Sequence, residues 1–143
     1  MDIKRILLFN KIKYNFSNSK LKQLLVKLSE DNKLIQDTHE YNEDEFNQLL
    51  SNNLVKFGIS YKFILDDDYP QLLKSINEAP VFIFYIGNEK LFDTEMISVV
   101  GTRNPTEYGK RITDKLVSEL AGSNLTIVSG MAFGIDKISH ISA

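Results

Sequence analysis

The sequence predicts an α/β protein in which a small N-terminal helical domain precedes a truncated parallel sheet with flanking helices. Leucines recur at helical spacing in the first third of the chain, and short apolar runs alternate with amphipathic helical patterns in the last third. Continuous apolar runs are typical of strands in parallel sheets, which are covered on both faces. We therefore expect a helical domain over residues 1–65 and an α/β domain over residues 66–143.

The composition excludes several classes of function. Of the 143 residues, 43% are apolar and 25% are charged, as in ordinary globular domains. Apolar runs such as residues 81–86 are far shorter than the roughly 18 residues that span a bilayer, so we expect a cytoplasmic protein without membrane contact. The sequence has no cysteine, and His39 and His140 lie far apart, so we expect neither a metal ion nor a cofactor.

Charge is divided unevenly along the chain. Residues 1–27 hold seven basic residues and one acid, whereas residues 28–68 hold three basic residues and ten acids. The remaining segment is almost neutral, with seven basic and eight acidic residues. No large basic field is therefore present to hold duplex DNA nonspecifically. We interpret the basic N-terminal stretch as a solvated helix face, with a contribution to nucleic-acid binding as the alternative.

The N-terminal domain is expected to contain helices up to about residue 57. Four leucines within residues 21–28 share one helix face, and Asn18 or Ser19 is the expected N-cap. Another helix begins in the acidic stretch of residues 42–45, where negative charge favours a helix N-terminus. It ends near Gly58, the expected C-terminal cap.

The rest of the chain alternates between strand and helix patterns. Residues 59–65 are expected to form a half-buried strand, and the acidic run at residues 66–68 marks the expected domain boundary. After a short helical connector we expect strands at 81–86 and 97–100, a helix at 107–121, a strand at 126–128 and a helix from about 133. The chain stops inside this last helix, whereas open doubly wound sheets normally have five or more strands. We therefore expect a fragment or a truncated form of a longer protein.

Two glycine-bearing turns carry most of the functional information. Each follows a predicted buried strand and precedes a helix, an arrangement that presents backbone amides to anions. On neighbouring strands, the two turns would form a single anion-binding crevice. The candidate binding residues are Gly101, Thr102, Arg103, Thr106 and Gly109 in the first turn, and Ser129, Gly130 and Gly134 in the second.

The polar side chains of these turns have different expected roles. Arg103 can hold a phosphate with two hydrogen bonds or stack on a base, and a salt bridge with Glu107 or Asp136 is an equally supported alternative. Thr106 is the expected N-cap of the following helix. Ser129 is placed to donate to a phosphate oxygen, although a cap is the commoner role of such a serine.

No catalytic residue is expected in the turns. The glycine spacing does not match the dinucleotide fingerprint, and Lys110 is not followed by the Ser or Thr that a P-loop requires. Asp136 is expected to brace the loop or the helix start, and although it can pair with His140 on one helix face, no nucleophile lies beside them. Met131 and Phe133 are expected to pack against the protein rather than to stack on bases.

At these residues the sequence resembles the DNA-processing protein A family, DprA or Smf. The matching motifs are, in order, Tyr69-Pro70, residues 80–87, residues 99–109, and residues 128–136 with His140. The resemblance implies an extended Rossmann-like fold for residues 66–143, and a SAM-like or helix-hairpin-helix-like domain for residues 1–65. It also implies that the two turns line a pocket for single-stranded DNA, with Arg103 as the leading phosphate contact.

The function that this resemblance implies is binding without catalysis. Members of the family bind incoming single-stranded DNA, protect it and load the RecA recombinase during natural transformation, and the full-length form is expected to be a homodimer. One alternative is a Rossmann-like enzyme that binds nucleotides or processes nucleoside phosphates, with Asp136 and Glu107 as its only nearby carboxylates. The other is a nonfunctional truncated remnant whose sheet edge lacks its covering partners.

Overall fold

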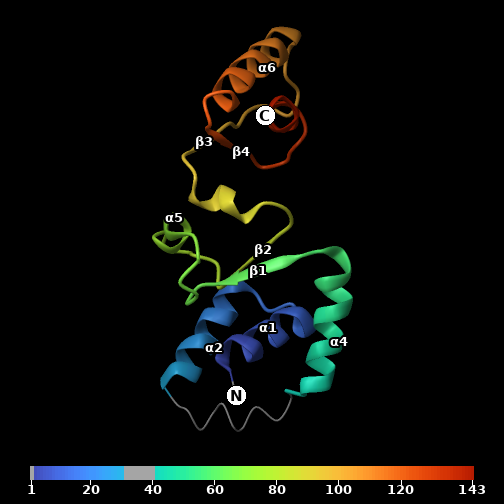
Figure 1. Cartoon of the computed structure of the whole chain (residues 1–143), viewed down its shortest axis with the longest axis vertical. Coiled ribbons are helices and arrows are strands. Elements are labelled where there is room, and N and C mark those ends of the chain that lie inside the picture. Colours follow the sequence, from blue (N-terminus) through green and yellow to red (C-terminus); the bar gives the residue numbers. More distant parts are fainter. Residues whose placement is uncertain (1, 31–40) are drawn as a thin grey trace. The chain divides into compact units, whose positions relative to one another are not determined.

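The computed structural model describes residues 2–30 and 41–143 of the chain (Figure 1). Contacts between the described residues divide the chain into two compact units. The boundary between them in the sequence falls between Glu89 and Lys90. Residues 31–40, which include His39, were expected to belong to the helical domain. They lie outside the described residues.

The first unit confirms the predicted helices at its N-terminus. Its helices are α1 (Ile3–Tyr14), α2 (Asn18–Glu30), α4 (Glu43–Asn53) and the short 3₁₀ helix η1 (Val55–Phe57). Asn42 caps α4, since its side chain accepts a hydrogen bond from the amide of Glu45 at 2.9 Å. Gly58 ends η1 with φ of 64° in the left-handed region, as expected for a C-terminal cap.

The predicted N-cap of α2 was wrong. Neither Asn18 nor Ser19 precedes the helix; Ser17 does, and its hydroxyl accepts a hydrogen bond from the amide of Lys20 at 3.3 Å. The Asn18 side chain has a different role, because its Oδ1 accepts from the amide of Val81 at 2.7 Å. Asn18 thus ties the start of α2 to a segment more than sixty residues along the chain.

Helix α1 is the centre of the first unit. Four consecutive residues, Ile6 to Phe9, are at most 1% exposed, so this helix is covered on all sides. Part of the cover comes from an antiparallel pair of strands, β1 (Ser60–Phe63) and β2 (Phe82–Tyr85), in which Phe63 lies opposite Phe82. Both phenylalanines join the same apolar core as α1.

The partner of strand β2 differs from the sequence prediction. The apolar run at residues 81–86 was expected in the parallel sheet, but β2 pairs antiparallel with β1. The segment before β2 is anchored to the first unit, because the buried Tyr69 donates its hydroxyl hydrogen to the carbonyl of Pro80 at 2.6 Å. Along the chain, the short helix α5 (Gln71–Lys74) comes after β1 and before β2, in the expected connector. The domain boundary at residue 65 stays a prediction. The first compact unit extends to Glu89.

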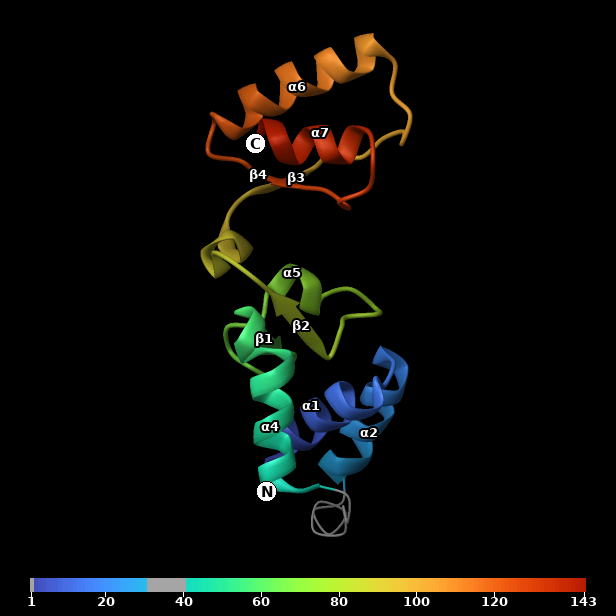
Figure 2. The ribbon, with the colours of Figure 1, turned by 90° about the vertical axis from the view of Figure 1, so that its right-hand side faces the viewer.

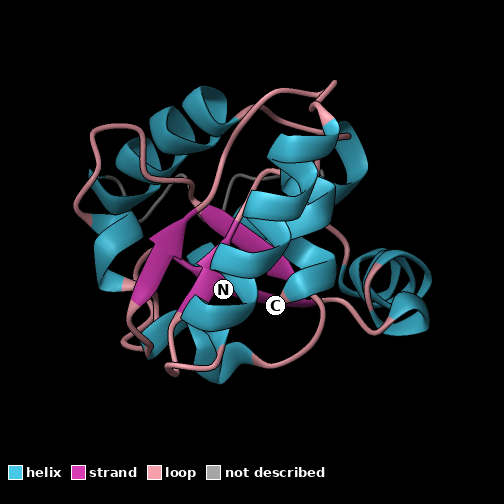
Figure 3. Cartoon of the chain, turned by 90° about the horizontal axis from the view of Figure 1, so that it is seen from above, coloured by secondary structure: helices cyan, strands magenta, loops and turns pink. Residues whose placement is uncertain are grey.

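The second unit confirms a parallel strand pair with flanking helices. After the 3₁₀ helix η2 (Glu89–Asp93) come β3 (Met96–Ser98), α6 (Glu107–Ala121), β4 (Thr126–Val128) and α7 (Ile135–Ser142). Strands β3 and β4 are parallel, with Ile97 opposite Ile127. Helices α6 and α7 pack against each other on one face of this pair (Figure 2). In both units the strands are short and most of the described structure is helical (Figure 3).

Candidate functional site

The two glycine-bearing turns lie next to each other, as predicted. They follow β3 and β4, which are parallel neighbours, so both turns leave the sheet at the carboxyl ends of its strands. A main-chain hydrogen bond joins them directly, because the amide of Ile135 donates to the carbonyl of Thr102 at 3.1 Å. Ligands of α/β sheets bind at this edge.

Two glycines allow the turns to approach this closely. Gly134 has φ of 84°, and a Cβ at this position would overlap the carbonyl oxygen of Thr102 and lie 2.7 Å from Cα of Arg103. A Cβ on Gly101 would lie 2.6 Å from Cγ1 of Ile135. Both positions therefore require glycine for the packing of one turn on the other.

Polar groups of the first turn are engaged within the turn itself. Thr106 caps α6 as predicted, since its Oγ1 accepts from the amide of Gly109 at 3.2 Å. The hydroxyl of Thr102 accepts from the amide of Asn104 at 3.2 Å. These hydrogen bonds hold the turn in shape, and they occupy the amides of Asn104 and Gly109.

Polar groups of the second turn are engaged in the same way. The hydroxyl of Ser129 donates to the carbonyl of Val99 at 2.6 Å, which ties the second turn to the end of β3. The carboxylate of Asp136 accepts from the amide of Gly130 at 3.1 Å and is only 6% exposed, so Asp136 braces the loop as expected. The amide of Gly130 is therefore occupied, as are those of Asn104 and Gly109 in the first turn.

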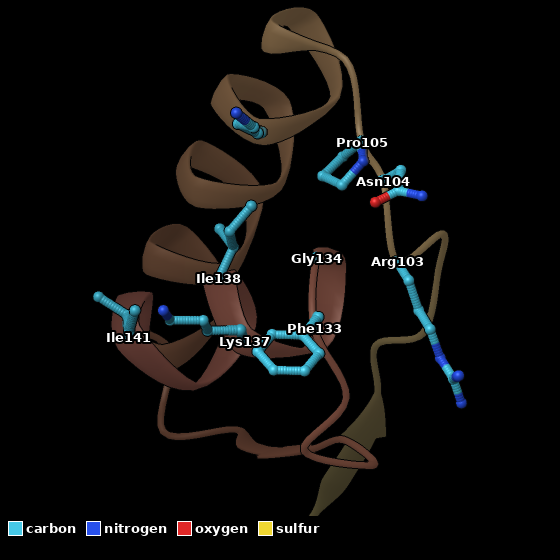
Figure 4. Close-up of a pocket in the computed structure, with 9 residues that line it drawn as sticks. Arg103, Asn104, Pro105, Phe133, Gly134, Lys137, Ile138 and Ile141 are labelled. Carbon is cyan, nitrogen blue, oxygen red and sulfur yellow. The ribbon is translucent and has the colours of Figure 1, made fainter.

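A pocket of about 610 Å³ opens beside the turns (Figure 4). Three cationic side chains and no carboxylate line it, so an anion would meet no repelling acid in its wall. Helix α6 contributes one lining residue and helix α7 contributes three. The lining residues are Arg103, Asn104, Pro105, Lys110, Phe133, Gly134, Lys137, Ile138 and Ile141.

The cations of the pocket differ in how they are paired. Lys110 forms an ion pair with Glu107 at 2.6 Å. Arg103 and Lys137 are exposed and form no ion pair with any residue that the structure describes. The alternative salt bridge of Arg103 with Glu107 or Asp136 is therefore not formed. In Figure 4 the side chains of Arg103 and Lys137 extend in opposite directions, and the Arg103 guanidinium points outward from the other labelled residues.

Two apolar residues of the second turn are exposed, contrary to the prediction that they pack. The exposed fractions of Phe133 and Met131 are 77% and 84%. Positive φ angles at Met131 (57°) and Gly134 (84°) bend the loop sharply on either side of Phe133. The Phe133 ring lies close to Lys137 in Figure 4. An exposed aromatic ring beside cations is the arrangement on which unpaired bases stack.

Other candidate groups near the turns show no catalytic arrangement. His140 is exposed and forms no hydrogen bond with Asp136, although both lie on α7. Within residues 2–30 and 41–143, no cluster of His, Cys, Asp or Glu could hold a metal ion. No helix in this described part of the chain is long and apolar enough to cross a membrane.

Sequence reasoning missed two of the pocket's cations. Lys110 and Lys137 line the pocket but were not among the candidate binding residues. Each lies in the first turn of the helix that follows one of the glycine turns. Basic residues at this position of both helices are the signal in the sequence that would have found them.

A model of a known protein family matches more than half of the chain. The model described as "DNA recombination-mediator protein A" matches residues 60–143. Among curated proteins, the chain is 41% identical over 87 residues to the DNA processing protein DprA of Bacillus subtilis, covering 60% of this chain and 29% of that protein. It is 42% identical over 80 residues to DprA of Streptococcus pneumoniae, covering 56% and 28%. The matched segments thus cover less than a third of these relatives' lengths.

Two solved structures resemble the chain. The X-ray structure of DprA from Streptococcus pneumoniae matches 99% of this chain and 49% of that chain, with a TM-score of 0.57 and 25% identity. A structure of DNA processing protein A from Helicobacter pylori, whose description concerns a single-stranded DNA binding mode, matches 58% of this chain and 38% of that chain. Its TM-score is 0.52 and its identity is 34%. The fold of the chain is therefore that of this group, including its Rossmann-like part.

Proposed function

The chain belongs to the DNA recombination-mediator protein A family, and we propose that the pocket beside its two glycine turns binds single-stranded DNA. The observation that carries this proposal is a pocket with three cations, no carboxylate and an exposed aromatic ring. Arg103 and Lys137 bind phosphates, and Phe133 stacks on a base. Both contacts are independent of base sequence, because every nucleotide offers a phosphate and a flat face.

A single strand suits this pocket better than a duplex. Stacking on Phe133 requires a base whose face is free, and the bases of a duplex are already stacked on one another. Duplex binding by charge alone depends on many phosphate contacts, whereas this second unit offers only a few unpaired cations. The description of the Helicobacter pylori relative supports the same ligand.

The glycines at the turns support binding indirectly. Gly101 and Gly134 keep the turns in contact and so fix where Arg103 stands relative to α7. Of the other predicted binding residues, Thr102, Thr106, Gly109, Ser129 and Gly130 hold the shape of the turns through the hydrogen bonds described above. We propose that these residues position the binding cations.

We also propose that the site binds without catalysis. The two carboxylates nearest the turns have other partners, Glu107 with Lys110 and Asp136 with the amide of Gly130. A general base needs a carboxylate within hydrogen-bond reach of a substrate proton. The rival assignment as a nucleotide-processing enzyme would require one of these contacts to break.

For the whole protein we propose a role in handling incoming DNA in the cytoplasm. It would protect single strands during natural transformation and load the RecA recombinase on them, acting as a homodimer. The family description as a recombination mediator and the curated name DNA processing protein support this role. The pocket supplies the step that this chain can perform, which is holding the strand.

The test is the affinity of the chain for fluorescently labelled oligo-dT, measured by anisotropy at several salt concentrations. Arg103→Ala should weaken binding roughly tenfold or more, because a hydrogen-bonded phosphate contact to a charged group is lost. Arg111→Ala is the matched control, since Arg111 is an exposed arginine on α6 outside the pocket. Equal affinities of Arg103→Ala and the parent would contradict the proposal.

A second measurement separates the proposed function from the enzyme alternative. Thermal unfolding is followed with nucleoside monophosphates and with oligo-dT. Oligo-dT should raise the unfolding temperature, because a ligand that binds only the native state stabilises it. Stabilisation by a monophosphate without any by oligo-dT would favour the enzyme, and stabilisation by neither would favour a nonfunctional remnant.

A further inference from the structure

The basic and acidic segments of the first unit largely neutralise each other. The sequence places an excess of positive charge before residue 28 and an excess of negative charge after it. In the structure, four of the seven early cations form ion pairs with later acids. The pairs are Lys4 with Asp66 at 2.6 Å, Lys13 with Glu45 at 2.9 Å, Lys22 with Glu78 at 3.3 Å, and Arg5 with Glu43.

The three early cations that remain lie before α2 and along it. Lys11 donates to the carbonyl of Phe16 at 3.0 Å, so its ammonium lies at the turn before α2. Lys20 and Lys27 lie on α2 itself and are exposed. None of the three forms an ion pair with an acid in residues 2–30 or 41–143.

Two of these cations border a small hollow, which we call the α2 patch. Its volume is about 150 Å³, and its lining contains no acid. Lys20 lies over the ring of Phe16, with its ammonium 3.8 Å from the ring centroid. The residues of the α2 patch are Phe16, Lys20, Gln23, Leu24 and Lys27.

We propose that the α2 patch is a second binding site for the sugar-phosphate backbone of nucleic acid, separate from the pocket of the second unit. Lys20 and Lys27 are seven positions apart, so they lie on one face of α2 and about 10 Å apart along its axis. A ligand with regularly repeated negative charges can meet both ammonium groups at once. This proposal extends the proposed function but depends only on the surface of the first unit.

The lining of the patch favours nucleic acid over an acidic protein segment. Lysine ammonium groups bind phosphates as point charges without a fixed geometry, which suits a flexible strand. The apolar side chains of Phe16 and Leu24, which line the same hollow, suit the sugars and bases that alternate with phosphates. An acidic peptide would bring carboxylates without such flat apolar groups.

The experiment uses the whole chain and two double variants with equal changes in charge. Lys20→Gln/Lys27→Gln removes the cations of the patch. Lys22→Gln/Lys56→Gln is the matched control, because Lys22 lies on the same helix but is paired with Glu78, and neither residue lines the patch. Binding of labelled oligo-dT of about thirty nucleotides is measured by anisotropy against salt concentration, and circular dichroism compares the fold of the variants.

The patch variant should bind roughly tenfold more weakly at low salt than the control variant. The slope of log affinity against log salt should fall by about 1.4, because each phosphate contact to a single strand contributes about 0.7. Equal affinity and slope in the two variants would overturn the proposal. It would also be overturned if poly-glutamate of matched charge displaced the labelled oligonucleotide from the parent as effectively as unlabelled oligo-dT does.

The outcome for the α2 patch can be distinguished from the outcome for the pocket in the second unit. If Arg103→Ala leaves binding unchanged while the patch variant weakens it, the α2 patch stands and the proposed function of the pocket fails. If Arg103→Ala weakens binding while the patch variant does not, the pocket stands and the α2 patch is overturned.

Discussion

The two units of the chain use their charged and apolar residues in opposite ways. In the first unit, most early cations are paired with acids, and α1 is buried on all sides by its neighbours. In the second unit, Arg103 and Lys137 have no acid partner in the described structure, and Phe133 and Met131 are exposed. The first arrangement stabilises a fold, and the second leaves cations and an aromatic ring accessible to a ligand.

The difference shows why charge totals say little about binding. Both units contain basic residues. Only the cations that have no acid partner are available to a phosphate. In the first unit this condition singles out the α2 patch from a strongly basic stretch. In the pocket of the second unit it leaves Arg103 and Lys137, because Lys110 is paired with Glu107.

The largest expected effect on stability comes from the centre of the first unit. Leu8→Ala should lower its free energy of unfolding by about 2–5 kcal/mol, because a fully buried leucine is replaced by a cavity. Hydrogen exchange of the α1 amides measures the effect on this unit alone. The exposed Val26 of α2 is the control, and Val26→Ala should change stability far less. Equal effects would contradict the assignment of α1 as the centre.

The contact between the glycine turns is the next most sensitive feature. Gly134→Ala should destabilise the second unit by about 1–3 kcal/mol, since it combines a positive φ with a main-chain overlap. It should also weaken binding of oligo-dT, because the first turn is displaced from α7. In the control Gly109→Ala, the added Cβ makes ordinary contacts, and the α6 helix should be as stable or slightly more stable. A Gly134→Ala protein with unchanged stability and affinity would show that the turns do not need this contact.

The smallest expected effect concerns acid titration of the first unit. The ammonium of Lys62, 2.6 Å from Asp68, holds the pKa of that carboxyl below its ordinary value of 3.8. The hydroxyl of Tyr85, followed by Lys62, holds the pKa of Glu89 below its ordinary 4.5. Both carboxylates are therefore favoured in the folded state. Their contribution is complete above pH 4.5 and is lost as the pH falls through the lowered values.

Lys62→Met tests this titration. The loss of stability between pH 5 and pH 3 should become shallower for the first unit, because the main cause of the lowered pKa of Asp68 is removed. The effect should be small, since the side chains of Asp68 and Glu89 are 66% and 55% exposed. Urea unfolding at a series of pH values measures it. Identical pH profiles for parent and variant would contradict the role of Lys62.

Local signals in the sequence predicted much of the second unit. The helix at 107–121, its Thr106 cap and the strand at 126–128 depend on neighbouring residues, and the structure confirms all three. The contact of the two turns was also predictable, because parallel strands place their carboxyl ends at one edge. The exposure of Phe133 could not be predicted, because it depends on a bend of the backbone that the residue type does not reveal.

Long-range partners account for most of what the sequence did not show. The antiparallel pairing of β2 with β1 depends on anchors such as the hydrogen bonds of Asn18 and Tyr69 to the segment before β2, and no local pattern indicates them. Which cations stay unpaired is likewise a property of the folded chain. The basic stretch was visible in the sequence, but the ion pairs that neutralise most of it join residues up to 62 positions apart.

The central claim is that the two turns bind one single strand together. The most direct test is a titration of the isotope-labelled chain with oligo-dT, followed by the shifts of backbone amide resonances in NMR spectra. We predict large shifts in both residues 101–106 and residues 131–138, saturating at the same oligonucleotide concentration. Shifts confined to one of these turns, or absent from both while the oligonucleotide still binds, would contradict the claim.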